Sequence, residues 1–373
     1  MMRRIFIRTA LAAAIVSALS LGGCGSNQNG ISTIQMGGAK QGNLLTLTGT
    51  VSVLAGQAPQ MGTADGTGSA ARFNAPSGIT TDGTNLYVAD TGNNLIRKVV
   101  ITTGAVTTLA GTVGTGTAQT SGSTDGTGSA AKFNAPFAIT TDGTNLYVAD
   151  TNNNTIRKVV IATGTVTTLA GSVGIPGSAD GIGPAGLFNS PGGITTDGTN
   201  LYVSDTGNRT IRKVVIATGA VTTLAGSAGT PGSTDGVGPS ALFGTVFGIT
   251  TDGTSLFVAD TDNSTIRKIV IATGMVTTLA GSAGVSGIAD GTGSTAKFNA
   301  PFGITTDGTN LYVTDSRQGS IRKVAIATGV VTTLVNGSSL TTISPLNFPL
   351  GISTDGLNLY VADTDNSTID LIK

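Results

Sequence analysis

Apolar and polar residues follow a fixed order in the stretch that begins at Asp82, and this order predicts short strands joined by tight turns. The apolar run LYVA follows the polar turn DGTN, and the run LIRKVV follows the polar turn TGNN. Near-copies of the stretch begin at five further aspartates: Asp142, Asp197, Asp252, Asp307 and Asp355. A unit repeated at this period indicates a repeat protein whose units bury their apolar faces against their neighbours.

Each repeat predicts four antiparallel strands, as residues 73–111 illustrate. The first strand surrounds Ile79, the second is LYVAD, the third is LIRKVVI and the fourth is AVTTLAG. Asp-Gly between the first two strands supplies the backbone that a tight hairpin needs. Six such units without a long helical pattern predict an all-β, six-bladed β-propeller with four-stranded blades. A solenoid of stacked repeats is the alternative fold.

The two ends of the repeat region favour a closed ring. The last repeat stops after its third strand, TIDLIK, whereas residues 47–56, LTGTVSVLAG, resemble a fourth strand and precede the first repeat. We expect residues 47–56 to complete the last blade beside TIDLIK, because this pairing removes an open sheet edge.

Residues 1–23 differ from the repeats and predict a lipoprotein signal peptide, with arginines before an apolar run that ends in Leu-Gly-Gly-Cys. The run is too short to span a bilayer comfortably. A lipid on Cys24, the one cysteine of the chain, would anchor the protein to a membrane. Residues 24–43 then form a flexible polar tether, and residues 44–373 form the propeller. The predicted location is the cell envelope, at the outer membrane if the cell is Gram-negative.

Composition narrows the range of partners. The net charge is zero and only 11% of the residues are charged, so the chain has no basic excess for nucleic acid. The 56 glycines suit a turn-rich β protein, and 39% hydrophobic residues exclude a disordered glycine-rich chain. We therefore expect no nucleic-acid partner, and membrane contact only through the lipid anchor.

The repeats resemble those of the NHL family, whose pattern combines Pro-x-Gly-Ile, an apolar Tyr-Val-Ala-Asp strand and an Asn-containing turn before Ile-Arg. The matching residues of the first repeat are Pro76, Gly78, Ile79, Tyr87, Val88, Ala89, Asp90, Asn93, Ile96 and Arg97. The resemblance covers residues 44–373 and implies a six-bladed propeller. The histidine of the family pattern is replaced by Asn94, Asn154, Arg209, Ser264, Gly319 and Ser367. The resemblance therefore implies no histidine-dependent activity.

The ionisable residues limit the chemistry of the chain. There is no histidine, and all 20 acidic residues are aspartates. Most recur at three repeat positions: the start of the DG turn, the end of the YVAD strand and the loop between repeats. Turn aspartates bond their own backbone, and strand-ending aspartates suit pairing with the arginine of IRK. We therefore assign structural roles to these aspartates.

Enzymes built on six-bladed propellers need other residues. A resemblance to streptogramin lyases or peptidylglycine-amidating lyases would imply histidines, and one to gluconolactonase-like hydrolases would imply a glutamate at a metal. We predict no catalytic residue, no metal and no cofactor. Two alternatives remain open: calcium at aspartate-rich turns such as residues 150–154, 260–264 and 363–367, and an active site of Asp, Arg and Tyr residues.

The predicted function is a non-catalytic binding or scaffold module for a protein, peptide or glycan ligand. The alternative is an envelope lyase or hydrolase whose site lacks both histidine and glutamate. In a four-stranded blade, the connections between blades and the turns between the second and third strands lie at the same end of the ring. Since binding residues usually lie on loops that a rigid scaffold holds, we expect the ligand at this end, the long-loop face.

The residue after the leading proline of each repeat, or its equivalent, is predicted to face the mouth of the channel. These residues are Ser77, Phe137, Gly192, Phe247, Phe302 and Leu350. One interpretation is that the bulky members form an apolar ligand pocket, with Asp262 and Arg317 from nearby turns at its rim. The other is that they pack together and plug the channel.

Overall fold

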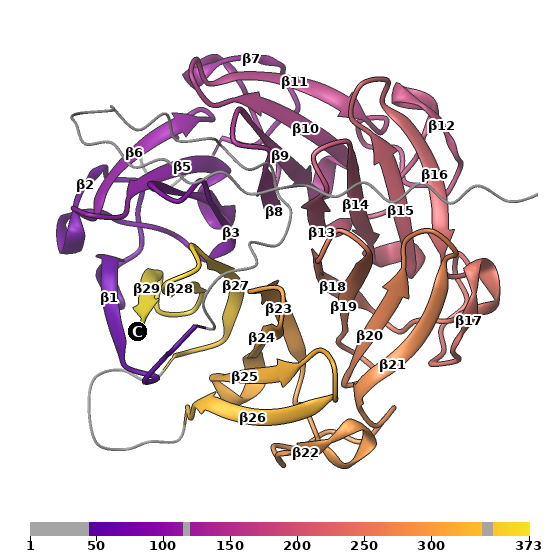
Figure 1. Ribbon diagram of the computed structural model, residues 1–373. Helices are drawn as coiled ribbons and strands as arrows, with labels where there is room; N and C mark the ends of the chain where they lie inside the picture. Colours follow the sequence, from indigo (N-terminus) through magenta and orange to yellow (C-terminus); the bar gives the residue numbers. More distant parts are fainter. Residues whose placement is uncertain (1–44, 115–119, 338–345) are drawn as a thin grey trace, which may run out of the picture. The chain divides into compact units, whose positions relative to one another are not determined.

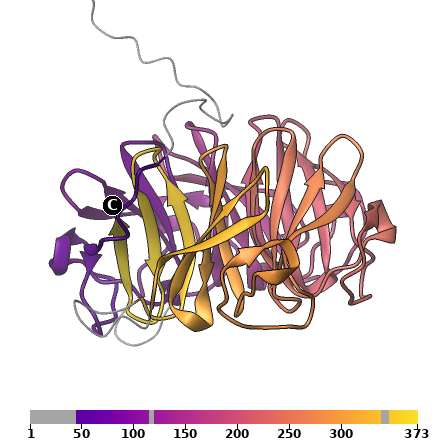
Figure 2. The ribbon, with the colours of Figure 1, turned by 60° about the horizontal axis from the view of Figure 1, so that its bottom comes forward.

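The structure, a computed structural model, describes residues 45–114, 120–337 and 346–373. Within these residues the chain forms six antiparallel sheets, which are the blades of a β-propeller around a central channel (Figure 1). Figure 2 shows the blades from the side, with their strands running between the two ends of the ring. The predicted signal peptide, Cys24 and the tether lie outside the described residues. No helix in the described part of the chain is long and apolar enough to cross a membrane.

Five blades share one strand order, in which four strands run outward from the channel and a short strand pairs with the outermost one. Blade 1 contains β3 (Pro76–Thr81), β4 (Asn85–Asp90), β5 (Leu95–Val100), β6 (Ala105–Ala110) and β2 (Gly66–Thr67). Blade 2 contains β8 (Pro136–Thr141), β9 (Asn145–Asp150), β10 (Thr155–Val160), β11 (Thr165–Ala170) and β7 (Gly126–Thr127). Blade 3 contains β13 (Pro191–Thr196), β14 (Asn200–Asp205), β15 (Thr210–Val215), β16 (Ala220–Ala225) and β12 (Gly181–Ile182).

The remaining blades complete the ring. Blade 4 contains β18 (Val246–Thr251), β19 (Ser255–Asp260), β20 (Thr265–Val270), β21 (Met275–Gly281) and β17 (Gly236–Val237). Blade 5 contains β23 (Pro301–Thr306), β24 (Asn310–Asp315), β25 (Ser320–Ala325), β26 (Val330–Val335) and β22 (Gly291–Thr292). Blade 6 contains β27 (Pro349–Thr354), β28 (Leu359–Asp363), β29 (Thr368–Ile372) and β1 (Val51–Gly56).

Single turns of 3-10 helix lie in the loops between blades and after the second strands of four blades. Those between blades are η1 (Gly68–Ala70), η3 (Gly128–Ala130), η5 (Gly183–Ala185), η7 (Gly238–Ser240) and η8 (Gly293–Thr295). Those after second strands are η2 (Thr91–Asn93), η4 (Thr151–Asn153), η6 (Thr206–Asn208) and η9 (Ser316–Gln318).

The short fifth strand was not predicted from the sequence. In blade 1 it comes from the loop between blades, where Gly66 pairs with Val106 and Thr67 with Ala105 of the outermost strand. A two-residue pairing has no hydrophobic periodicity, so the sequence pattern gave no sign of it. The strand covers part of the outer edge of the blade, which would otherwise expose unpaired backbone groups.

The predicted closure of the ring is confirmed. Strand β1 pairs antiparallel with β29, with Val51 opposite Ile372 and Gly56 opposite Thr368. The hydroxyl of Thr364 in blade 6 also donates to the carbonyl oxygen of Pro76 in blade 1, at 2.7 Å. Residues from the two ends of the propeller therefore complete one sheet, in which β1 covers the edge of β29.

Apolar side chains fill the spaces between neighbouring blades. Tyr87 of blade 1, for example, packs in one buried cluster with Phe133 and Ile139 of blade 2. The inner strands lie very close together: a Cβ atom added at Gly78 would lie 2.5 Å from the carbonyl oxygen of Phe137. In blade 1 the approach of the next blade therefore favours glycine at this position of the pattern, whereas blade 2 has Ala138 there.

Candidate functional site

The mouth of the channel is built by an irregularity in each inner strand. In blade 1, Pro76 pairs with Asp90 and Gly78 with Ala89, which leaves Ser77 without a partner residue, and the other blades show register shifts at the same place. A bulge of this kind turns a side chain away from its regular direction. It therefore presents the residue after the leading proline to the channel.

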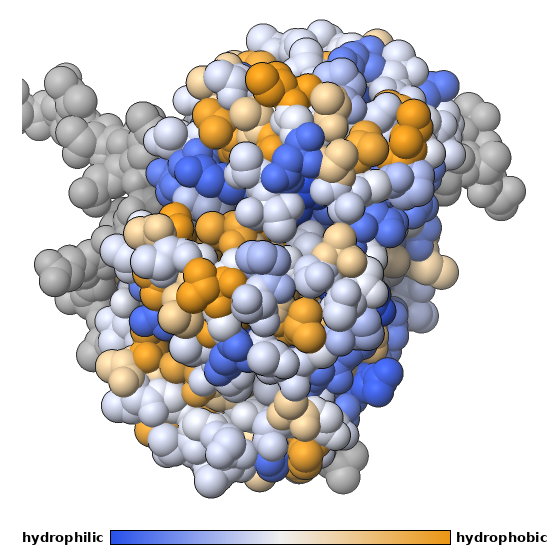
Figure 3. Space-filling view, turned by 90° about the vertical axis from the view of Figure 1, so that its right-hand side faces the viewer, coloured by the Kyte–Doolittle hydropathy of each residue, from blue (hydrophilic) through white to orange (hydrophobic). Residues whose placement is uncertain are grey.

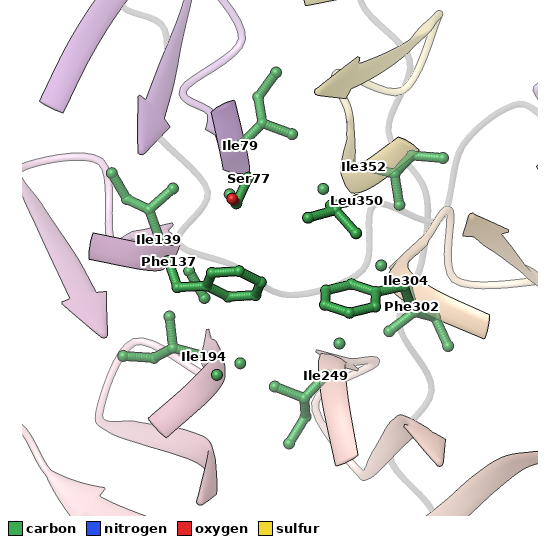
Figure 4. A pocket seen from close by; sticks show the side chains of 17 residues that line it. Ser77, Ile79, Phe137, Ile139, Ile194, Ile249, Phe302, Ile304, Leu350 and Ile352 are labelled. Atoms are coloured by element: carbon green, nitrogen blue, oxygen red, sulfur yellow. The ribbon is translucent and has the colours of Figure 1, made fainter. Parts of the chain in front are cut away.

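Three of these residues form an aromatic cluster. The ring of Phe247 stacks on that of Phe302 with 4.2 Å between their centroids. Phe137 completes the cluster, with its ring centroid 5.9 Å from that of Phe247 and 5.7 Å from that of Phe302. Figure 4 shows the rings of Phe137 and Phe302 pointing toward each other across the channel, with Leu350 and Ser77 on the facing side. The structure thus brings together all four bulky residues predicted at the mouth.

Small residues make room for this cluster. A Cβ atom added at Gly192 would lie 2.9 Å from the ring of Phe247, so a larger residue there would displace the ring. The hydroxyl of Ser77 is held by Thr91, at 2.9 Å. The uneven mouth predicted from the sequence is therefore a packed arrangement, in which small residues accommodate the rings.

The cavity at the mouth is small. Its volume is about 70 Å³, and its walls include the backbone of the inner strands and a ring of six isoleucines: Ile79, Ile139, Ile194, Ile249, Ile304 and Ile352. A pocket that encloses a drug-sized ligand has a volume of about 300 Å³ or more. The Phe cluster thus leaves too little space for such a ligand inside the channel, and a ligand of that size has to lie across the mouth.

Asp262 and Arg317 lie at the same end of the ring but outside the cavity wall. Both are exposed and follow the second strands of blades 4 and 5. The carboxylate of Asp262 accepts hydrogen bonds from the backbone N–H and the hydroxyl of Thr245. The backbone N–H of Arg317 donates to the carbonyl oxygen of Asn299, at 3.3 Å. Neither side chain is among the residues that line the cavity.

Hydrogen bonds between the turns and the interblade loops hold the long-loop face together. In blade 1 the N–H of Gly92 donates to Asn74, and the side chain of Asn93 donates to the carbonyl oxygen of Gly62. The hydroxyl of Thr91 reaches the next blade and donates to Pro136, at 2.6 Å. Turns and interblade loops therefore lie at one end, as the strand order predicts. Part of the sixth interblade loop lies outside the described residues.

Asparagines at two of the positions where the family pattern has histidine link neighbouring blades. Asn94 has a left-handed backbone with φ of 57°, and its side-chain oxygen accepts a hydrogen bond from the N–H of Ala135 in the next blade, at 2.7 Å. Asn154 and Ser190 repeat this link at 2.8 Å. An amide side chain therefore performs a structural task at this position, which needs no imidazole.

Every arginine of an IRK segment is buried in a network of carboxylates. Arg157 donates through Nη1 to Asp150 and through Nη2 to Asp125, both at 2.7 Å. The guanidinium also donates to two backbone carbonyl oxygens and lies 5.2 Å from the ring centroid of Phe133. The pairing with the strand-ending aspartate was predicted from the sequence. The role of the loop aspartate was not, although each IRK segment occurs together with one loop aspartate and one such phenylalanine.

The aspartate of each DG turn holds the opposite end of the blade. The carboxylate of Asp82 accepts backbone N–H groups from Thr84 and Asn85, and the hydroxyl of Tyr87 donates to it at 2.9 Å. Although burial opposes it, these hydrogen bonds lower the pKa of Asp82. Burial and the same contact with Asp82 raise the pKa of Tyr87. Asp82 therefore stays ionised and Tyr87 stays neutral, which suits a structural pair.

Comparison with known proteins gives two kinds of match, although no family model matches the chain. The chain is 29% identical over 306 residues to NHL repeat-containing protein 2 of Homo sapiens, a match that covers 74% of this chain and 42% of that protein. The chain therefore spans less than half the length of this curated relative.

Solved structures show the same fold at lower identity. An auxiliary nutrient binding protein from Bacteroides thetaiotaomicron is 14% identical with a TM-score of 0.63, over 87% of this chain and 76% of that chain. A catalytically inactive histidine-to-alanine variant of virginiamycin B lyase from Staphylococcus aureus, with quinupristin, is 15% identical with a TM-score of 0.51. That match covers 87% of this chain and 99% of the lyase. At these identities the likeness concerns the fold alone.

Proposed function

We propose that this NHL-repeat, six-bladed β-propeller is a non-catalytic binding module whose long-loop face holds a protein, peptide or glycan ligand. A lipid on Cys24 would anchor the module in the cell envelope, where the tether would let the propeller reach its ligand. Two features of the chain support this reading: the structural use of its ionisable groups, and the shape of the channel mouth.

The observation that carries the proposal is that the repeated charged side chains already have structural bonding partners. The strand-ending aspartates of five blades are fully buried and paired with arginine, as in Asp90 with Arg97 at 2.7 Å. The described residues hold no group of three or more His, Cys, Asp or Glu side chains that could bind a metal ion. At turns 150–154 and 260–264, Asp150 and Asp260 already bond arginine, asparagine and backbone groups. These carboxylates are therefore not free for general acid–base work or for calcium.

The rival function, a lyase or hydrolase, has less support. In the virginiamycin B lyase that shares the fold, replacing a histidine by alanine gives a catalytically inactive protein. This chain contains no histidine at any position. Any lyase chemistry would need another base, and in five blades the aspartate that ends the second strand is buried in an ion pair.

The shape of the mouth supports binding across it. Phe137, Phe247 and Phe302 are partly exposed and lie together at the end of the ring that carries the long loops. Aromatic groups at such a position offer a large apolar contact area to a ligand. By contrast, apolar residues on the flank of the ring lie in small groups between polar ones (Figure 3). A nutrient binding protein with the same fold is consistent with a ligand-binding role.

The proposal is tested by probing glycan and peptide arrays with the labelled protein and measuring the affinity for each hit. Phe137→Ala and Phe302→Ala should weaken binding about tenfold, because each removes an aromatic contact worth about 1.4 kcal/mol. The control is Leu357→Ala, since Leu357 is 74% exposed at a DG hairpin on the opposite end of the ring. Melting temperatures distinguish lost contact from lost folding.

Two results would count against the proposal. If both Phe variants lose stability but bind each hit as tightly as the wild type, the aromatic cluster only plugs the channel. If mass spectrometry shows that an array hit is cleaved or rearranged by the protein, the module is an enzyme.

A further inference from the structure

Blade 6 breaks the pattern of buried arginines. In blade 1, Arg97 lies opposite Val88 and donates to the strand-ending Asp90. In blade 6 the residue opposite Val361 is Asp370, which therefore stands where the other blades have arginine. The strand-ending aspartate, Asp363, is kept. Two acidic side chains thus face each other where every other blade pairs an acid with a base.

The other partners of the arginine have changed with it. Asn74 and Asn347 each donate a backbone N–H to the strand-ending aspartate, so Leu346 occupies the position of Phe73, whose ring lies under Arg97. Val53 lies opposite Asp370, where blade 1 places Thr108 opposite Arg97. Residues 335–349 contain no aspartate to match the loop aspartate. Blade 6 therefore lacks the aromatic ring and, in its sequence, the loop aspartate that accompany the arginine in the other blades.

Both acidic side chains are buried at the seam of the ring. Asp363 is 1% exposed and Asp370 is 3% exposed. Asp363 accepts the N–H of Asn347 at 2.7 Å and the side-chain N–H of Asn366 at 2.8 Å. Oδ1 of Asp370 is buried without a hydrogen-bond partner in the described part of the chain. The register of β28 and β29 places the two carboxyl groups side by side in the buried seam, where a hydrogen bond between them requires a proton on one of them.

We propose that Asp363 and Asp370 share one proton, and that this proton holds strand β29 in place and so makes closure of the ring sensitive to pH. Two ionised carboxylates in such a buried site would repel each other and would lack the solvation that water supplies. Strand β1 pairs with β29 and joins the propeller to the N-terminal residues. Loss of the proton would therefore weaken the pairing of β1 with β29.

Few other charges face the pair. Strands β1 and β27 contain no charged residue, and Arg322 of blade 5 is already paired with Asp290 and Asp315. Asp365 follows β28 and is exposed, and Lys373 ends the chain beyond β29. Burial, with Asp363 as the second cause, raises the pKa of Asp370 to about 8, and burial raises that of Asp363 to about 6.

The direction of the pH effect follows from these shifts. Because the folded-state pKa of Asp370 is raised above its unfolded value of about 3.9, protonation stabilises the folded seam. This contribution is complete below pH 4 and is lost as the pH rises through about 8. Between pH 7 and pH 9.5 the equilibrium constant for opening the seam should rise about tenfold, since one proton with a pKa of about 8 is released.

A shared proton fits the site better than a bound cation. The five guanidinium groups lie among carboxylates, carbonyl oxygens and an aromatic ring, as around Arg97. At Asp370, Leu346 takes the place of the aromatic ring, and residues 335–349 contain no aspartate. A hydrated divalent ion prefers about six oxygen ligands, whereas an O–H group needs a single acceptor.

The experiment follows the carboxyl groups directly in the full-length protein labelled with ¹³C in its aspartate side chains. One carboxyl signal should titrate above pH 7, and Asp370→Asn should remove it while the protein stays folded. The urea midpoint of the wild type should fall from pH 7 to pH 9.5 relative to that of Asp370→Asn. Asp262→Asn is the matched control, since it removes the exposed acid at the equivalent position of blade 4, away from the pair, and should keep the wild-type pH dependence.

Three results would overturn the proposal. The first is the absence of any aspartate signal that titrates above pH 7. The second is an equal pH dependence of the urea midpoint in the wild type and in Asp370→Asn. The third is stabilisation at pH 9.5 by added calcium or magnesium in the wild type alone, which would assign a cation to the pair. If Asp370→Asn fails to fold, Asp363→Asn tests the same pair by the same signal.

Discussion

Replacing Arg157 by methionine tests whether the buried networks hold the blades together. Methionine keeps the unbranched apolar stem of the side chain but removes the guanidinium. That group donates to Asp150 and Asp125, and to the carbonyl oxygens of Lys132 and Thr124 at 3.0 and 3.2 Å. The change therefore leaves one fully buried carboxylate without its counter-ion.

The expected size of the effect follows from the exposure of the two aspartates. The side chain of Asp150 is 0% exposed and that of Asp125 is 48% exposed. Breaking a buried ion pair by removing one partner costs about 3–5 kcal/mol, because the remaining charge stays buried. A pair with an exposed partner contributes about 1 kcal/mol or less. Arg157→Met should therefore lower the free energy of unfolding by about 3–5 kcal/mol, and Asp125→Ala by about 1 kcal/mol.

The assay is chemical denaturation of the Cys24→Ser chain at pH 7, followed by fluorescence and circular dichroism. A third variant combines Arg157→Met with Asp150→Asn. Its amide carries no charge and still accepts the N–H of Asn134, which donates to Asp150 at 2.8 Å. The double variant should regain more than about 1 kcal/mol over Arg157→Met, because the buried charge has gone.

The reasoning would be refuted by either of two outcomes. Equal losses in Arg157→Met and Asp125→Ala would show that burial of the carboxylate does not set the cost. A double variant no more stable than Arg157→Met would show that the cost lies in lost packing rather than in an unpaired charge.

Two predictions concern the N-terminal part of the chain. Deleting residues 25–43 should leave a folded propeller. Deleting residues 25–56 also removes β1 and exposes the edge of β29, so it should cause aggregation, which light scattering measures. Equal solubility of the two deletions would contradict the role of β1 in closure. Cys24→Ser should abolish incorporation of labelled fatty acid and move the protein from the membrane fraction to the soluble fraction, and continued membrane association would mean that another attachment exists.

The repeat pattern was sufficient to predict the ring. Hydrophobic periodicity and DG turns located the strands of every blade, because these signals are local and recur six times. The match between LTGTVSVLAG and a fourth strand predicted the closure, which the pairing of β1 with β29 confirms. The pairing of Arg97 with Asp90 could also be predicted from the sequence, since the strand register places them on one face.

The site was predicted less completely. The position after the leading proline was identified at the channel, but stacking of Phe247 on Phe302 and the small cavity depend on six strands converging from distant parts of the sequence. The bulges that aim these side chains have no sequence signal beyond the glycine. The loop aspartates were assigned a structural role, but their arginine partner was not predicted, because Asp65 meets Arg97 across 32 residues of chain.

The sequence by itself determined which residues recur, and hence the blade, its turns and its repeated ion pair. Only the tertiary structure decided the role of a residue that departs from the repeat pattern. Asp370 replaces the arginine of the other repeats, but its role depends on Asp363 lying beside it in the buried seam where β1 pairs with β29. Burial and proximity set the protonation of such a pair, and both arise only when the two ends of the propeller close on each other.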